Sequence, residues 1–324
     1  MGKVRYRLGI DAQLNNKVKV GAGITTGGLN PRSSFAVFEN SFERKELNLD
    51  YAYGEWKAAT WASVIMGKYP SDQYLWHPTD MAWDPDLKPE GASAHLEKSI
   101  IDGHVKGFVN GGVMVIDEAF NRQDDPTMYY VQPGVRFEQG PFDAQFSVQR
   151  FAFNSVNSPS IALDHSSCSN SGLTPNGDPN VDSCGAGSKL QLEYDSGGAG
   201  AEIGYKFMDS KRFAVFGEYV KNLATSVNDV GWAAGGRVGS IKVEKFGDWQ
   251  LLYQYTYLQR DAVLDIFPNS DRYNGETNIR GIKGALDFGL WSNIKVGLSF
   301  YNDDRIKDAK ARKTTLLSDV TYSF

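Results

Sequence analysis

The stretch that decides the fold is residues 4–13, which read Val-Arg-Tyr-Arg-Leu-Gly-Ile-Asp-Ala-Gln. In an extended strand successive side chains point to opposite faces, so the apolar residues of this stretch share one face and the charged residues the other. Asn15 and Asn16 turn the chain, and residues 17–24 alternate again. The opening therefore predicts a β-hairpin with one apolar and one polar face. The apolar face holds Val4, Tyr6, Leu8, Ile10, Val18, Val20 and Ile24, and the polar face holds Arg5, Arg7, Asp11, Gln13, Lys17 and Lys19.

The same period of two recurs to the end of the chain, and no segment has a helical period. Apolar stripes occur at 47–53, 102–116, 128–138, 142–149, 212–221, 249–257, 282–288 and 294–300. Short turns at 14–16, 57–60, 100–103, 139–141, 208–211, 244–248 and 291–293 alternate with long polar loops at 27–45, 68–92, 117–127, 154–188, 222–228, 260–277 and 303–312. Strands joined in this way are typical of a transmembrane antiparallel β-barrel. A soluble β-sandwich also alternates and stays open as the second interpretation.

The composition fits a barrel better than a helical membrane protein. No run of about 18 apolar residues is present, which excludes a transmembrane helix. The 34 Gly, 16 Tyr and 18 Phe suit tight turns and aromatic belts at a membrane surface. No linker or change in composition divides the chain, so residues 1–324 are expected to form one domain. The net charge of -5 is spread along the chain without a basic block, which argues against nucleic acid as a partner.

Two further features indicate the cell surface. Cys168 and Cys184 bracket a stretch rich in Ser, Asn, Gly and Pro, and a disulfide in the external loop 154–188 would suit an oxidising compartment. Two free thiols are the alternative. The last strand ends on Tyr322 and Phe324, a C-terminal pattern that resembles the address read by the bacterial barrel-insertion machinery.

Strand direction predicts how many strands this sequence contains. The first strand enters a short turn and the last ends at the C-terminus, so both run toward the periplasm. Neighbouring strands in an antiparallel ring cannot be parallel, so the number of strands in this sequence should be odd. Following the direction of each strand through the turns and loops gives fifteen strands. Single-chain bacterial barrels usually have an even number. We therefore expect a full barrel of about sixteen strands, with one N-terminal strand and a signal peptide lying outside this sequence.

Loop 68–92 is the candidate for a constriction inside the pore. It contains prolines that would stiffen it and aromatic residues that would anchor it to the wall. Opposed rows of charge across a narrow aqueous gap select among small polar solutes and ions. The alternative is a surface lid with solvated charges. The predicted acidic edge comprises Asp72, Asp80, Asp84, Asp86 and Glu90, and the predicted basic edge of the wall comprises Arg5, Arg7, Lys17 and Lys19.

Other chemistry finds little support in the sequence. Asp178 and Asp182 lie in an alternating run that could bind Ca²⁺, but no Glu follows at the required spacing, so a solvated turn is favoured. No zinc pattern is present. His95 and Ser93 are close in sequence, but a polar pair in the wall explains them better than a lipid-hydrolysing enzyme, and Gly-x-Ser-x-Gly does not occur. No reaction and no cofactor are expected.

The residues also resemble the bacterial "putative porin" family over nearly the whole chain. The likeness rests on the 5–13 and 17–21 strands, Gly28 with Pro-Arg-Ser at 31–33, Ala-Tyr-Gly-Glu-Trp at 52–56, Gly-Lys at 67–68, Trp-Asp-Pro-Asp at 83–86, Pro-Glu-Gly at 89–91, Phe-Gly-Glu-Tyr-Val-Lys-Asn at 216–222, Gly-Asp-Trp at 247–249 and Asp-Ala-Val-Leu at 261–264. The resemblance implies a porin, often a trimer, with a further strand before the Arg-Tyr-Arg run.

The sequence thus predicts an outer-membrane porin of a Gram-negative bacterium that passes small hydrophilic solutes and ions by diffusion. Its expected partners are outer-membrane lipid and lipopolysaccharide, the barrel-assembly machinery and two further copies in a homotrimer. A closed barrel that acts in adhesion or surface binding through its external loops is the alternative. If the pore interpretation holds, neutralising Asp80, Asp84 and Asp86 together should lower the preference for cations.

Overall fold

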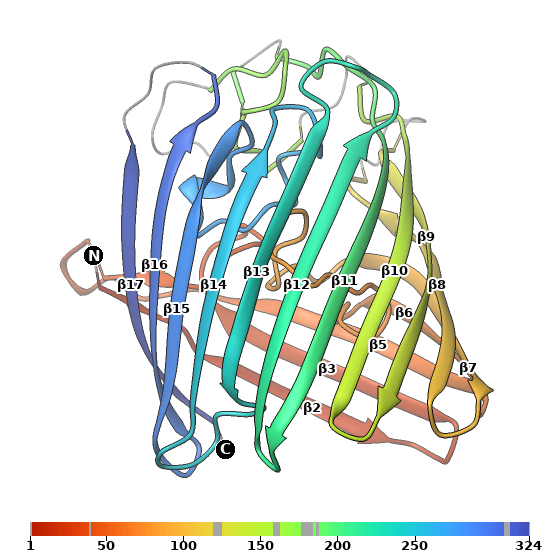
Figure 1. Ribbon diagram of the computed structural model, residues 1–324. Coiled ribbons are helices and arrows are strands. Elements are labelled where there is room, and N and C mark those ends of the chain that lie inside the picture. Colours follow the sequence, from red (N-terminus) through yellow and green to blue (C-terminus); the bar gives the residue numbers. More distant parts are fainter. Residues whose placement is uncertain are drawn as a thin grey trace.

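In the computed structural model, which describes residues 2–38, 40–118, 125–157, 163–175, 184–185, 188–307 and 312–323, the chain is an antiparallel β-barrel. Figure 1 shows the curled sheet, with the C-terminal strands in front and β2, β3, β5 and β6 crossing behind them. The sheet has fifteen strands, the number that strand direction predicted. They are β2 (Arg7–Gln13), β3 (Val18–Thr26), β5 (Leu47–Ala59), β6 (Ala62–Lys68), β7 (Glu90–Ile101), β8 (Val105–Val115), β9 (Thr127–Gln139), β10 (Phe142–Asn154), β11 (Asp195–Met208), β12 (Lys211–Asn222), β13 (Val230–Ser240), β14 (Trp249–Leu258), β15 (Ile279–Trp291), β16 (Ile294–Arg305) and β17 (Lys313–Tyr322).

The order of the sheet is the order of the sequence. Each strand of the main sheet pairs with the next one along the chain, from β2 to β17. Within the described residues, β2 and β17 have one neighbour each and form the two edges of the sheet. The sixteenth strand stays a prediction.

The first predicted strand is interrupted. The short strand β1 (Lys3–Val4) leaves the main sheet and pairs with β4 (Ala36–Val37) in the connection after β3. Two short 3-10 helices, η1 (Asn40–Phe42) and η2 (Tyr273–Gly275), complete the elements. Among the described residues no helix is long and apolar enough to cross a bilayer.

The outer face of the sheet is apolar, as the alternation predicts. Ile10 is 72% exposed and Ile203 57% exposed, although both lie in the middle of regular strands. Because apolar groups in such numbers are unfavourable in water, this face is suited to lipid. The dry clusters of the protein lie on the other side, between inward-folded loops and the lumen wall.

One predicted stripe is wrong. Residues 47–53 were expected to place Leu47, Leu49, Tyr51 and Tyr53 on one face, but a β-bulge shifts the register of β3 against β5 between Gly23 and Ile24. The extra residue turns the tyrosines into the lumen, where the Tyr53 hydroxyl donates to Asp11 at 2.7 Å. Leu49 stays outside and is 58% exposed.

The long connections join the strands at the same end of the antiparallel sheet, and this end is called the long-loop end. Cys168 and Cys184 form a disulfide there, as predicted, inside the connection between β10 and β11. The proposed calcium residues Asp178 and Asp182 and the terminal Phe324 lie outside the described residues. Tyr322 is the last residue of β17.

Candidate pore constriction

The connection between β6 and β7 is the core of the candidate site and spans residues 69–89, slightly less than the predicted 68–92. Prolines at 70, 78, 85 and 89 remove backbone donors and prevent the segment from joining the sheet. In Figure 1 this orange segment lies within the curl of the sheet. It is called loop 69–89 below.

Two tyrosines fasten the start of loop 69–89 to the inner wall. Tyr69 and Tyr74 are almost fully buried and pack on Ile65 of β6. The Tyr74 hydroxyl donates to Glu55 of β5 at 3.1 Å, and the Tyr130 hydroxyl of β9 donates to the Tyr74 carbonyl at 2.6 Å. Phenol groups supply buried area and also satisfy the polar groups that they cover.

Gln132 of β9 then holds the backbone of the loop. Its side-chain oxygen accepts from the Trp76 N–H at 2.9 Å, and its nitrogen donates to the Trp76 carbonyl at 2.7 Å. The amide therefore replaces the strand partner that this segment lacks. Asn110 of β8 donates to Gln132 at 3.0 Å and Gln132 donates to Gln149 of β10 at 2.8 Å, so a row of buried amides supports the clamp.

Glu218 of β12 receives the next part of the loop. Its two carboxylate oxygens contact the His77 ring nitrogen and the Thr79 hydroxyl, each at 2.5 Å. The His77 ring also lies parallel to the Trp83 ring, with 6.0 Å between the centroids. The wall thus presents one buried acid to two side chains of the same loop.

Asp80 joins loop 69–89 to strands near the C-terminal end of the sheet. It pairs with Lys283 of β15 at 2.5 Å and accepts from Gln254 of β14 at 2.8 Å and from Asn269 at 2.7 Å. Burial alone would raise the pKa of Asp80, but the charges of Lys283 and Arg272 hold that pKa below its usual range. Asp80 is therefore an ionised anchor.

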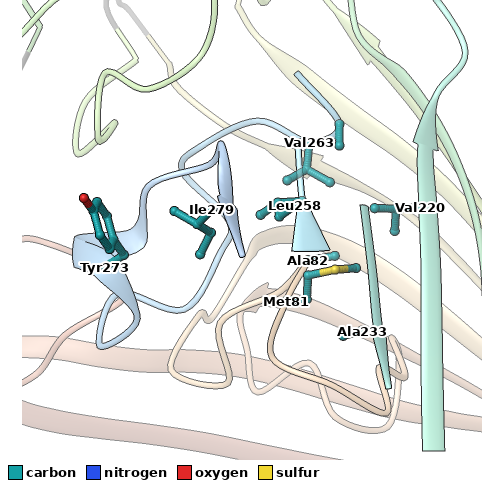
Figure 2. Close-up of a cluster of buried hydrophobic side chains, with 9 residues drawn as sticks. Met81, Ala82, Val220, Ala233, Leu258, Val263, Tyr273 and Ile279 are labelled. Atoms are coloured by element: carbon teal, nitrogen blue, oxygen red, sulfur yellow. The ribbon is translucent and has the colours of Figure 1, made fainter. Parts of the chain in front are cut away.

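An apolar cluster fixes the turn that follows. Figure 2 shows Met81 and Ala82 of the loop among side chains from the wall and from the connection between β14 and β15. Met81 is 1% exposed. Its long, flexible side chain fills the gap between the wall and the connection between β14 and β15. The other members are Val220, Ala233, Leu258, Ala262, Val263, Tyr273 and Ile279.

A second loop enters the lumen beside the first. The long polar loop predicted at 260–277 is the connection 259–278 in the structure, called loop 259–278. It does not stay at the surface, because Arg272 is 2% exposed and pairs with Asp303 of β16 at 2.7 Å. The N–H of Ser270 donates to Asp84 at 2.8 Å, so the two loops are joined directly. Arg32 donates to the carbonyls of Asp265 and His165, which ties three connections together at the long-loop end.

Asp84 provides a pH-dependent contact between the two loops. Burial raises its pKa to about 7, although the N–H groups of Ser270 and Asp86 that donate to it favour the ionised form. The docked loop therefore keeps a proton that an exposed aspartate releases above about pH 4. Docking is favoured at low pH and is progressively weakened as the pH rises from about 4 to 7.

We expect the thermal unfolding midpoint of the folded protein to fall across this pH range. Replacing Asp84 by Asn removes the titrating group and should flatten that part of the curve. The measurement is the loss of the folded form on gels after heating at pH 4.5 to 7.5. Parallel curves for the two proteins would contradict the assignment.

Asp86 meets two of the predicted basic residues. Arg7 of β2 donates to it at 3.0 Å and Arg5 at 3.3 Å. Arg7 also lies 3.7 Å from Asp50 of β5, which pairs with Lys88 at 3.0 Å. A cavity of about 350 Å³ is lined by these charges and by small polar residues of the connection after β3. The Asp86–Arg7 and Asp50–Lys88 pairs are therefore direct contacts that border this open space.

The other predicted site residues lie elsewhere. Asp72 is exposed on loop 69–89. Glu90 is the first residue of β7 and pairs with Lys68 at 2.9 Å. Lys17 lies at the turn between β2 and β3, and Lys19 pairs with Asp11 at 3.6 Å. The structure thus brings Asp86, Arg5 and Arg7 together and leaves Asp72, Lys17 and Lys19 apart from them.

Several polar residues of the wall were not singled out from the sequence. Gln132, Glu218 and Lys283 occupy lumen-facing positions of strands, so the period of two could have flagged them as inward. A second charged group, nearer the short turns, comprises Glu97, Arg136, Asp143, Glu202, Arg212 and Arg237.

The sequence and this geometry both point to one protein family. A family model described as "Putative porin" matches residues 1–176 and 192–324. The chain belongs to this family. The porin-like barrel is therefore established at the level of family and fold. Among curated protein sequences none matches this chain.

This porin family member is similar to several solved structures. A loop-deletion mutant of OmpT, an outer membrane protein of Vibrio cholerae, is 9% identical with a TM-score of 0.52, over 99% of this chain and 96% of that one. The outer membrane channel DcaP of Acinetobacter baumannii is 13% identical with a TM-score of 0.48, over 98% of this chain and 84% of that one. A mutant of the Rhodopseudomonas blastica porin is 10% identical with a TM-score of 0.46, over 99% and 90%.

Proposed function

We propose that this barrel is an outer-membrane porin of a Gram-negative bacterium, a water-filled channel through which small hydrophilic solutes and ions diffuse. The observation that supports this most is the arrangement around Asp86. A loop fastened to the lumen wall carries a partly exposed carboxylate to Arg7 of β2 and to Arg5, which lies just before β2; both arginine side chains are 34% exposed. Charges held in this way at the edge of open space act on passing ions.

The outer surface supports the membrane location and the partners of the proposal. Its apolar side chains suit outer-membrane lipid and lipopolysaccharide. We also propose that Tyr322, the last residue of β17, contributes to recognition by the barrel-assembly machinery. The proposal includes a homotrimer because the resemblance to the family implies one. No cofactor enters the function.

The decisive experiment is a planar-bilayer recording of the purified, folded chain. We expect discrete, uniform current steps in potassium chloride, and none from the same preparation after heat unfolding. A folded protein that inserts without conducting would contradict the porin function.

Selectivity should depend on Asp86 in particular. Replacing Asp86 by Asn removes the carboxylate that Arg5 and Arg7 share, so the permeability ratio of potassium to chloride should fall. One charge at about 4 Å in water changes an ion's free energy by about 1 kcal/mol, roughly a fivefold change in the permeability of that ion, and the effects on potassium and chloride have opposite signs. The reversal potential in a salt gradient measures it. Asp72→Asn, on the same loop but away from the arginines, is the matched control, and equal values for the two variants would remove Asp86 from the constriction.

The second candidate function is a non-conducting barrel that acts in adhesion or surface binding. The interlocked connections at the long-loop end favour it: Arg32 is 4% exposed, and Asp265, fully buried, accepts from Ser166 at 2.7 Å. A rigid outer surface of this kind is suited to recognition as well as to shaping a pore mouth. Absence of conductance together with specific retention on a bacterial or host surface would favour this function.

A further inference from the structure

We propose that the mouth of the lumen at the long-loop end contains a binding site for small organic cations with an apolar body, such as aromatic ammonium ions. A cavity of about 490 Å³ lies there between the end of loop 69–89, the ends of β8 and β9, and loop 259–278. Ligand sites of drug-sized molecules typically measure about 300–1,000 Å³. The cavity therefore has room for a molecule of one ring and a short chain.

The floor of the cavity is apolar, which is unusual for a water-filled lumen. Trp83 and Leu87 of loop 69–89, Met114 of β8, Met128 of β9 and Phe267 line it together. The Trp83 and Phe267 rings stack with their centroids 5.2 Å apart. Such a surface gains free energy by covering an apolar group, and aromatic faces and methionine side chains also attract cations and rings.

The charges around this floor favour a cation. The two lysines of the lining already have partners, because Lys68 pairs with Glu90 at 2.9 Å and Lys88 pairs with Asp50 at 3.0 Å. Three carboxylates of the lining, those of Asp117, Glu118 and Asp164, form no ion pair within the described part of the chain. The unpaired charge of the described lining is therefore negative, and an organic anion would meet repulsion from it.

The cavity opens toward the constriction. Pro31, Lys68, Lys88 and Glu90 line both this cavity and the polar cavity beside Asp86 and Arg7. A solute that leaves the apolar floor reaches the charged passage directly. The site goes beyond the proposed channel function, since a molecule can bind at the mouth whether or not the barrel conducts.

Calorimetric titration of the folded protein in detergent tests the site without any need for conduction. The probes are phenethylammonium, ethylammonium, which keeps the charge and lacks the ring, and phenylpropionate, which keeps the ring and reverses the charge. We expect phenethylammonium to bind about tenfold more tightly than either of the other two probes, which corresponds to a difference in binding free energy of about 1.4 kcal/mol. Equal binding of phenylpropionate, or no binding of phenethylammonium, would overturn the proposal.

A charge variant makes the test specific to this cavity. The triple substitution Asp117→Asn, Glu118→Gln and Asp164→Asn should reduce phenethylammonium affinity about tenfold. Glu193→Gln, an exposed carboxylate near the start of β11 that does not line the cavity, should leave affinity unchanged. Unaltered affinity in the triple variant would refute the site. If binding persists but bilayers show no current, the channel function fails and the site stands.

Discussion

Replacing Asp80 by Ala is expected to release the middle of loop 69–89 from the wall of the lumen. Asp80 is 9% exposed and is the carboxylate that pairs with Lys283, whose side chain is 17% exposed. Removing one partner of a buried ion pair typically costs about 3–5 kcal/mol, because the other charge stays buried without compensation. Lys283 would then recruit water, and the loop would lose its ties to Gln254 and Asn269 as well.

Single-channel recording and heat stability together measure this effect. A released loop should give a larger and noisier conductance, and the folded form should be lost at a lower temperature. Asp80→Asn separates charge from hydrogen bonding, because an amide can still accept from Gln254. Asp72→Ala, an exposed carboxylate of the same loop, is the control. Normal conductance and stability in Asp80→Ala would show that the ion pair does not hold the loop.

Replacing Asp303 by Ala should have an effect of similar size on the second loop. Arg272 donates to Asp303 through two nitrogens, at 3.0 and 2.7 Å, and to Thr256 at 2.7 Å. Both charged side chains are almost completely buried, at 3% and 1% exposed. Loss of Asp303 leaves the guanidinium of Arg272 buried without an opposite charge, which again lowers the stability by about 3–5 kcal/mol. Loop 259–278 should then leave the lumen and become accessible to proteases.

Limited proteolysis followed by mass spectrometry would locate the cleavage. Asp304→Ala is a closely matched control, because Asp304 is the next residue of β16 and pairs on the exposed surface with Arg312. The double substitution Arg272→Met with Asp303→Leu removes both charges and should restore resistance, since apolar side chains of similar volume can replace a buried pair. Cleavage confined to other loops would argue against the anchor.

The fold could be predicted because the inward-facing and outward-facing positions of a barrel strand alternate in the local sequence. Alternation such as that of residues 4–13 needs no knowledge of distant residues, and the sequence of short turns and long loops fixes the order of strands. The error at residues 47–53 has a physical reason. A bulge inserts one residue and reverses the faces, and the composition of β5 gives no sign of where that insertion falls.

The candidate site was harder to predict because its contacts have no period. The sequence identified Asp80, Asp84 and Asp86 as equivalent acids, yet one pairs with a buried lysine, one accepts from backbone N–H groups and one faces arginines. These differences arise from partners such as Lys283 and Ser270, which belong to the other half of the chain. A charged residue's role in such a loop depends on burial, which the loop's own sequence does not encode.

The long sequence separation of the Asp80 contacts also sets an order for assembly. Asp80 meets Gln254, Asn269 and Lys283, which follow it by 174, 189 and 203 residues. Contacts between residues so far apart in sequence form only after the intervening strands have paired. Before that, no other contacts offset the entropy cost of closing so long a segment. In an assembly intermediate that still lacks its C-terminal third, loop 69–89 would therefore not be anchored across the lumen, and the lumen would be wide. The constriction would form only at the end of assembly.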